Sequence, residues 1–233
     1  MFGFSGIEFL GHEVTSETLS PRVQKVNEIL NAEVPKTKRQ VKSFLAMVGY
    51  YAKFIARFSD ITEPLTSMIK KGSPNVVKWN DEADKAFTLL KQLLSKRPVL
   101  AIFDTDGATY VQSDASDVGL GAALLQLESG KLHPVRYLSR KLTGAERNYS
   151  TIEKECLAIV WAIQKLKVFL YGREFILLVD NKPLVYLNEA NLKNARVMRW
   201  AMFLQDWSFR VESIKGSDNH CADYLSRSHN ETL

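Results

Sequence analysis

The sequence contains few residues of the kinds that form disulfides or zinc modules. It has two cysteines and four histidines in 233 residues: Cys156, Cys221, His12, His133, His220 and His229. Two cysteines exclude a disulfide framework and a zinc module built from several cysteines. The histidines are scattered and show no metal-ligand spacing. Both cysteines lie in stretches that we predict to be helical, where they serve as small core residues.

Long apolar runs and low-complexity tracts are also missing. No uninterrupted apolar stretch is long enough to span a bilayer, and no N-terminal segment combines basic residues with an apolar run. We therefore expect a soluble, intracellular protein with no membrane partner. Hydrophobic residues make up 45% of the sequence, which suffices for one large core or two small ones.

The charge balance is mildly basic. Lys and Arg number 31 against 26 Asp and Glu, which gives a formal net charge of +5. Such an excess suits a polyanionic partner, but many basic proteins bind no nucleic acid. Charge alone therefore leaves a nucleic-acid partner open.

A break in the helical pattern divides the chain near residues 70–77, where Lys-Lys-Gly-Ser-Pro-Asn favours a turn. Helices are predicted on both sides of the break: Arg22–Leu30, Lys38–Phe58 and Asp81–Lys96. Ser20-Pro21 and Thr37 are the predicted caps of the first two. The basic side chains of the second helix form either a solvated face or a surface for nucleic-acid phosphates: Lys38, Arg39, Lys42, Lys53 and Arg57.

From Thr109 onward the pattern changes to strands. Three strands joined by short turns predict an antiparallel meander: Thr109–Ser113, Gly119–Gln126 and Leu132–Ser139. Helices and further strands follow: Thr151–Leu170, Phe175–Val179, Ala195–Gln205, Phe209–Ile214 and Cys221–Arg227. This order predicts an α/β fold with a mixed five-stranded sheet flanked by helices. We assign residues 1–73 to a small, mainly helical unit, residues 74–106 to a connector and residues 107–229 to the α/β domain.

Two aspartates come at the ends of predicted strands. Asp114 ends the first strand of the α/β domain, and Asp180 follows the continuous apolar run Phe175–Val179. Continuous apolar runs mark strands buried on both faces, so we expect these two strands to be central and adjacent. The functional crevice of such a sheet lies beyond the carboxyl ends of its strands, where two aspartates would sit side by side. For Asp114 alone, a turn-starting role is the simpler reading.

Glu155 adds a third carboxylate from the long helix. It lies at the edge of the apolar stripe of that helix, while Lys154 and Lys165 are expected to point away from the stripe. A carboxylate that faces the sheet is costly unless it is paired or binds a cation. Glu153 fits a capping box with Ser150 and so has a structural role. We therefore choose Glu155 over Glu153.

Asp223 is the fourth candidate, because Ala222 and Leu225 beside it are packing residues that would turn it toward the sheet end. Asp218 fits a helix cap or a loop better. Converging carboxylates repel each other unless divalent cations neutralise them. Oxygen-only ligation favours Mg²⁺, with Mn²⁺ as the alternative, over zinc. Two such ions roughly 4 Å apart can activate a water and stabilise the leaving oxygen of a phosphodiester.

Short motifs along nearly the whole chain carry a family resemblance. The motifs of the α/β domain include Gln112-Ser113-Asp114-Ala115-Ser116, Tyr137-Leu138-Ser139-Arg140-Lys141-Leu142, Glu153-Lys154-Glu155-Cys156-Leu157-Ala158 and Ala222-Asp223-Tyr224-Leu225-Ser226-Arg227. They resemble the ribonuclease H region of gypsy-type LTR retrotransposon polyproteins. Upstream, Phe9-Leu10-Gly11-His12 and Phe44-Leu45-Ala46-Met47-Val48-Gly49-Tyr50-Tyr51 resemble the end of the reverse transcriptase polymerase region, its thumb.

The resemblance implies a ribonuclease H fold that cleaves RNA in RNA–DNA hybrids with two Mg²⁺ ions. Its catalytic, metal-binding acids would be the four chosen above: Asp114, Glu155, Asp180 and Asp223. Contacts to the hybrid would come from residues that otherwise form a polar loop: Arg140, Lys141, Arg147 and Asn148. Three aromatic residues are expected in the core rather than as stacking platforms: Tyr149, Trp200 and Trp207. The alternative function is a non-catalytic nucleic-acid-binding or scaffolding fragment of a degenerate or co-opted element.

The sequence departs from the family pattern at three points. Val179-Asp180-Asn181 stands where family members usually carry Thr-Asp-His, so a histidine beside the acid is lost while the ligand remains. Residues 210–216 contain no loop histidine, so slower turnover is expected. Fingers and palm are not found in this sequence, so we expect no polymerisation by this chain alone. The expected partners are the missing polymerase region or another reverse transcriptase subunit, in the cytoplasm (in a virus-like particle) or the nucleus.

Overall fold

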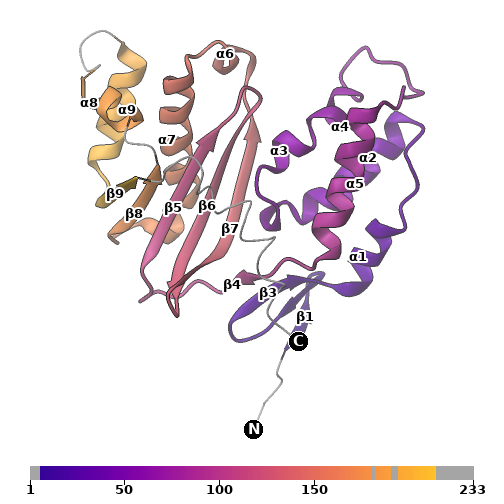
Figure 1. Ribbon diagram of the computed structural model, residues 1–233, viewed down its shortest axis with the longest axis horizontal. Helices are drawn as coiled ribbons and strands as arrows, with labels where there is room; N and C mark the ends of the chain where they lie inside the picture. The colour runs from indigo at the N-terminus through magenta and orange to yellow at the C-terminus, as the bar shows by residue number, and fades with distance from the viewer. Residues whose placement is uncertain (1–5, 180–181, 190–193, 214–233) are drawn as a thin grey trace.

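The computed structural model describes residues 6–179, 182–189 and 194–213. These residues form a small sheet with helices above it and, beside them, a larger sheet covered by helices (Figure 1). Asp180, Asp223 and the predicted helix Cys221–Arg227 lie outside the described residues.

The N-terminal part begins with strands that the sequence did not predict. An antiparallel sheet has the order β1-β2-β3-β4, and its strands are β1 (Ile7–Phe9), β2 (His12–Val14), β3 (Thr18–Pro21) and β4 (Leu100–Ala101). These strands have two to four residues each, too few to show an alternating pattern. Pro21, predicted at the first helical position, instead ends β3 opposite His12. Arg22 occupies the N-cap position of the helix α1 (Val23–Leu30) without a side-chain hydrogen bond to it.

The predicted helix Lys38–Phe58 is wrong in its second half. Its elements are α2 (Lys38–Tyr50), the 3₁₀ helix η1 (Ala52–Phe54), α3 (Phe58–Ile61) and α4 (Glu63–Ser67). Thr37 caps α2 through a capping box with Gln40, as predicted for Thr37. The helical spacing of apolar residues predicted a continuous helix here because Phe54 is buried, although it does not lie in an α-helix. Arg57 adopts the left-handed conformation, with φ of 53°, and turns the chain into α3.

The connector contains α5 (Asp81–Ser95), close to the predicted range. Asn80 caps it by accepting a hydrogen bond from the Ala83 backbone N–H, and three acids in the first turn suit the helix dipole. The apolar face of α5 packs against α1 and α4 in the core of the N-terminal part. The division at residue 73 stays a prediction.

The larger sheet is mixed and five-stranded, as predicted, with the order β7-β6-β5-β8-β9. Its strands are β5 (Thr109–Ala115), β6 (Gly119–Glu128), β7 (Lys131–Lys141), β8 (Phe175–Val179) and β9 (Phe209–Ser213). The first three form the predicted antiparallel meander. β8 is parallel to β5 and next to it, which confirms that these two strands are central and adjacent.

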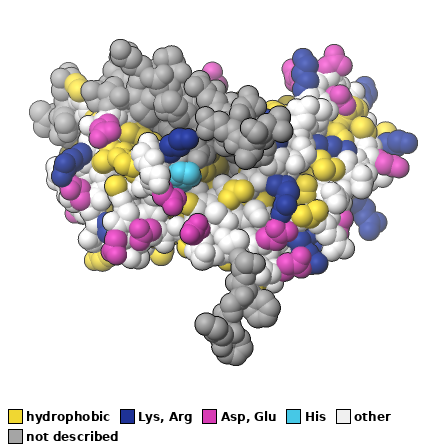
Figure 2. Space-filling view, turned by 60° about the horizontal axis from the view of Figure 1, so that its bottom comes forward, with side chains coloured by type: hydrophobic (Ala, Val, Ile, Leu, Met, Phe, Trp, Pro, Cys, Tyr) yellow, Lys and Arg dark blue, Asp and Glu magenta, His cyan; other side chains and the backbone are white. Residues whose placement is uncertain are grey.

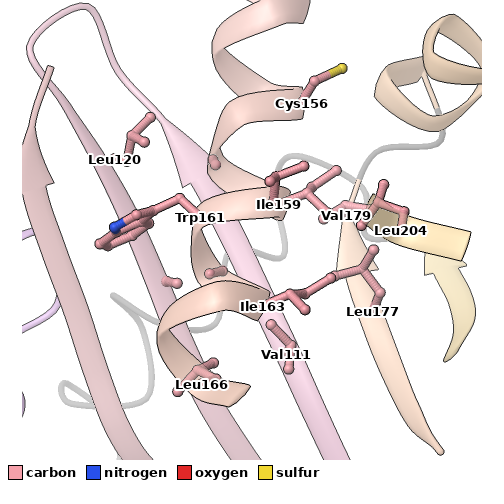
Figure 3. Packing of buried hydrophobic residues seen from close by; sticks show 14 of the residues in the cluster. Val111, Leu120, Cys156, Ile159, Trp161, Ile163, Leu166, Leu177, Val179 and Leu204 are labelled. Atoms are coloured by element: carbon pink, nitrogen blue, oxygen red, sulfur yellow. The ribbon is translucent and has the colours of Figure 1, made fainter. Parts of the chain in front are cut away.

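Four described helices accompany this sheet: α6 (Gly144–Arg147), α7 (Thr151–Leu170), α8 (Lys182–Glu189) and α9 (Ala195–Gln205). The long helix α7 has the predicted bounds and the predicted capping box between Ser150 and Glu153. Its apolar face, including Ile159 and Ile163, packs on the sheet (Figure 3). Within the described ranges, none of the helices has the combination of length and apolarity that a bilayer span requires.

Both faces of the central strands are buried. Successive residues of β6 alternate between two cores: Ala122 and Leu124 belong to the cluster around α7, whereas Ala123 and Leu125 belong to the core of the N-terminal part. Leu178 in β8 faces the N-terminal part in the same way. The apolar run of β8 is therefore continuous because helices from two parts of the chain cover its two faces.

Gly119, the first residue of β6, allows α3 to approach the sheet. A Cβ atom there would lie 2.5 Å from Asp60 Oδ1 and 2.6 Å from Ser59 Oγ. The Ser59 backbone N–H donates to Ser139 Oγ at 2.9 Å, and the two hydroxyl oxygens are 2.5 Å apart. These contacts hold α3 against the ends of β6 and β7.

We predict that Gly119→Ala lowers the free energy of unfolding by about 1–3 kcal/mol, because the added methyl group overpacks this contact. Gly144→Ala is the matched control, since a Cβ atom there meets no atom within 4 Å. The control should change stability by less than about 1 kcal/mol. Chemical denaturation of the three proteins measures the difference, and equal stabilities of the two variants would contradict this account of the α3 contact.

Candidate active site at the carboxyl end of β5

Asp114 lies where β5 leaves the core. The strand is buried at Val111 and Gln112, and Asp114, two residues on, pairs with Gly121 of β6. The Asp114 side chain is 43% exposed. Its Oδ2 atom is 3.7 Å from Nη1 of Arg57, which comes from the N-terminal part of the chain. A half-exposed carboxylate at a strand end is therefore accessible and already has a cation beside it.

The strand β8 ends at the same edge of the sheet. Its parallel register with β5 pairs Gln112 with Leu178, so Val179 is one residue beyond that pair. Asp180 follows Val179 in the sequence but lies outside the described residues, as Asp223 does. Of the four predicted acids, the structure thus describes Asp114 and Glu155.

Glu155 is half-buried near the N-terminal end of α7. An ion pair ties this end of the helix to the turn between β5 and β6, because Lys154 Nζ is 2.8 Å from Asp117 Oδ1. Lys154 precedes Glu155, and Asp117 comes three residues after Asp114. The pair therefore links the N-terminal end of α7, which carries Glu155, to the turn that follows Asp114. Figure 1 shows the N-terminal end of α7 and the end of β5 at the same end of the domain.

The expectation that Lys154 points away from the apolar stripe is wrong, since the residue is only 8% exposed. Its aliphatic stem packs while its ammonium group reaches Asp117, which a long side chain allows. The hydrogen bond from Lys154 holds the pKa of the Asp117 carboxyl below its usual value.

Glu153 has the structural role that the sequence predicted. It accepts hydrogen bonds from the Ser150 backbone N–H at 3.0 Å and from Asn194 Nδ2 at 3.2 Å. Arg196 Nη2 lies 2.5 Å from the same carboxylate. Glu153 thus caps α7 and links it to the start of α9, which leaves it unsuited to a shared metal site.

The donor chemistry at this edge fits a hard divalent cation. Asp114 and Glu155 offer only carboxylate oxygens, the ligands that Mg²⁺ and Mn²⁺ prefer. The Arg57 guanidinium beside Asp114 marks a place that accommodates positive charge. In the part of the chain that the structure describes, no three His, Cys, Asp or Glu side chains form a metal group. Two of the four predicted ligands lie outside that part.

A cavity of about 510 Å³ lies beside Asp114, between the N-terminal part and the sheet. Its wall is mainly apolar and includes Ile61, Leu89, Leu93, Ala122 and Ala123. Arg57, Asp60 and Ser113 add polar atoms near Asp114. The Asp114 carboxylate therefore borders this cavity on the side where Arg57 lies.

The four predicted nucleic-acid contacts fall into two pairs. Arg140 makes two hydrogen bonds to Glu146, at 2.7 and 2.9 Å, and these hold the pKa of that carboxyl below its usual value. Lys141 pairs with Glu63 of α4. Arg147 and Asn148, at the end of α6, are exposed. A phosphate contact by Arg140 or Lys141 would have to replace an existing ion pair, whereas Arg147 and Asn148 are accessible as they stand.

The aromatic residues near α7 and α9 are engaged within the protein. Trp200 and Trp207 pack against the core around α7. The Arg196 guanidinium lies 3.8 Å from the centroid of the Tyr149 ring, a cation–π contact. On the face shown in Figure 2, basic and acidic side chains are interspersed. On that face the described charges therefore form no broad basic patch.

The contact between Arg57 and Asp114 is the feature of the site that sequence reasoning missed. From the sequence alone, Arg57 is predicted only as part of a basic helical face. No pattern in the sequence connects it to Asp114, because the contact depends on how α3 docks on the sheet. The one feature of the sequence that could have drawn attention to Arg57 is that a basic residue lies within an apolar helical pattern.

Known proteins match both the domain and the whole chain. The family of RNase H-like domains found in reverse transcriptase matches residues 104–207. The retrovirus-related Pol polyprotein from transposon 297 of Drosophila melanogaster is 39% identical over 94% of this chain and 20% of the polyprotein. The transposon Tf2-3 polyprotein of Schizosaccharomyces pombe is 35% identical over 99% of this chain and 18% of the polyprotein. The chain thus spans about a fifth of the length of these curated relatives.

Solved structures share the fold at low sequence identity. A foamy viral protease-reverse transcriptase in complex with dsDNA has a TM-score of 0.74 at 22% identity, covering 91% of this chain and 45% of that one. Another, in complex with RNA/DNA hybrid, has a TM-score of 0.72 at 21% identity, covering 91% of this chain and 29% of that one. These likenesses show the ribonuclease H-like sheet together with the part that precedes it. Together these matches support a reverse transcriptase and ribonuclease H region of a retrotransposon polyprotein, with an RNase H-like domain at residues 104–207.

Proposed function

We propose that the chain hydrolyses RNA in RNA–DNA hybrids by internal cleavage, as the ribonuclease H part of a retrotransposon reverse transcriptase. One observation carries the proposal: β5 and the N-terminal end of α7 bring Asp114 and Glu155 to the same end of a ribonuclease H-like sheet. Carboxylates at the carboxyl ends of central strands are suited to metal-assisted phosphodiester chemistry.

The acids of this site would act as metal ligands, with no nucleophile supplied by the protein. Asp114 and Glu155 would hold the ions from β5 and α7, and we propose Asp180 and Asp223 as the remaining ligands. Two Mg²⁺ ions, or Mn²⁺ in their place, supply a water activated for attack and a charge that stabilises the leaving oxygen. The Lys154–Asp117 pair links the start of α7 to the β5–β6 turn, the two segments that carry or follow the described acids.

Binding of the hybrid would rest on phosphates and 2′-hydroxyls, so sequence specificity should be low. Arg147 and Asn148 are the best-placed of the predicted contacts because both are exposed at the end of α6. The foamy viral proteins that share this fold were solved with dsDNA and with RNA/DNA hybrid, which supports a nucleic-acid partner for this chain. A polymerase region or another reverse transcriptase subunit would complete the enzyme.

We predict that Asp114→Asn lowers the rate of hybrid cleavage by at least about a hundredfold, because the amide is a poorer ligand for a divalent cation. Asp106→Asn is the matched control, an exposed aspartate before the other end of β5, and should cleave like the parent. The assay uses end-labelled RNA in a DNA hybrid with Mg²⁺ or Mn²⁺. Tight binding of the hybrid by the parent without cleavage would refute the nuclease and favour the scaffolding alternative.

Arg147→Gln should weaken hybrid binding and reduce the slope of log affinity against log salt by about one, since one phosphate contact is lost. Lys165→Gln removes an exposed charge on the outer side of α7 and should leave the slope unchanged. Fluorescence anisotropy at several salt concentrations measures both slopes. If the two variants behave alike, Arg147 makes no contact with the hybrid.

A further inference from the structure

Arg57 is paired with Asp60 through one hydrogen bond and a second ion-pair contact to the same carboxylate oxygen. Its Nε atom donates to Asp60 Oδ2 at 3.0 Å, and its Nη2 atom lies 3.0 Å from the same oxygen. Two of the three guanidinium nitrogens are thus taken up by Asp60. The third, Nη1, is directed to Asp114 and lies 3.7 Å from its Oδ2 atom. Asp60 therefore aims a cation at the candidate metal ligand.

The backbone at Arg57 is unfavourable for a residue with a Cβ atom, since its φ is 53°. Such conformations persist where the surrounding structure enforces them, and they concentrate at functional sites. Here the enforcing contacts are those of α3 with the sheet. The Ser59 backbone N–H donates a hydrogen bond to Ser139, and α3 lies so close to Gly119 that no side chain fits there. The docked helix fixes the strained residue and its guanidinium together.

We propose that Arg57 is a positioning residue of the nuclease site, the resident counter-cation of Asp114 that a divalent ion must displace. The proposal rests on the proposed function, in which Asp114 binds metal. A guanidinium and a divalent ion compete for one carboxylate, because like charges so close together repel. Arg57 belongs to the part of the chain before the RNase H-like domain, so the nuclease site extends beyond residues 104–207.

The competition makes a prediction about metal affinity in the absence of nucleic acid. Arg57→Gln removes the cation at nearly constant size and should raise the affinity for Mn²⁺ about three- to fivefold, the range expected for a half-exposed ion pair. Arg57→Gly should do the same, and it relieves the strained backbone, so loss of folding cannot explain its effect. Arg57→Lys keeps the charge and should stay within about twofold of the parent.

The experiment titrates the full chain with Mn²⁺ and follows free Mn²⁺ by electron paramagnetic resonance. Arg147→Gln, which also loses one exposed arginine, corrects for net charge, and Asp114→Asn reports on the ligand itself. The inference is overturned if Arg57→Gln and Arg57→Gly bind Mn²⁺ like Arg147→Gln while Asp114→Asn binds it more weakly. If Asp114→Asn binds Mn²⁺ like the parent, Asp114 is no ligand, and the proposed function fails together with the inference.

Discussion

The structure depends on burial of the central strands of the five-stranded sheet on both of their faces. The helix α7 covers one face, and helices that precede the RNase H-like domain cover the other. Adjacent residues of β6 and β8 therefore serve two different cores, which explains their uninterrupted apolar sequence. A charged side chain in the middle of such a strand would be desolvated without a partner. In the central strands β5, β6 and β8, charged residues occur only toward the strand ends, and Asp114 stands at such a place.

The same constraint makes the candidate site a shared one. Because the N-terminal part packs on the sheet, α3 lies close to the end of β5 and brings Arg57 to Asp114. From the opposite face, α7 brings Glu155, and the pair between Lys154 and Asp117 connects its first turn to the β5–β6 turn. Two layers that bury apolar surface thus deliver a cation and a carboxylate to one edge. Packing, rather than proximity in sequence, assembles the chemistry.

The sequence predicted the long and strongly patterned elements well. Helix α7 and strand β8 have the expected bounds. The helix was predictable because a cap residue precedes twenty residues with a helical apolar pattern, and the strand because its apolar run is continuous. The caps at Thr37 and Ser150 are confirmed for the same reason. The strands β1 to β4 were missed because each is too short for a pattern. The break after Tyr50 was missed because Phe54 and Ile55 are buried at helical spacing in a segment that is not an α-helix.

For the candidate site, the residue types could be predicted from the sequence but their contacts could not. The strand ends and the apolar stripe of the long helix pointed to Asp114 and Glu155. The contact of Arg57 and the inward path of Lys154 depend on tertiary packing.

The most direct test of the central claim is a crystal structure with Mn²⁺ and its anomalous signal. The account predicts an anomalous peak with carboxylate oxygens of both Asp114 and Glu155 about 2.0–2.3 Å away. Asp114 and Glu155 facing separate surroundings, with Mn²⁺ bound elsewhere, would contradict it.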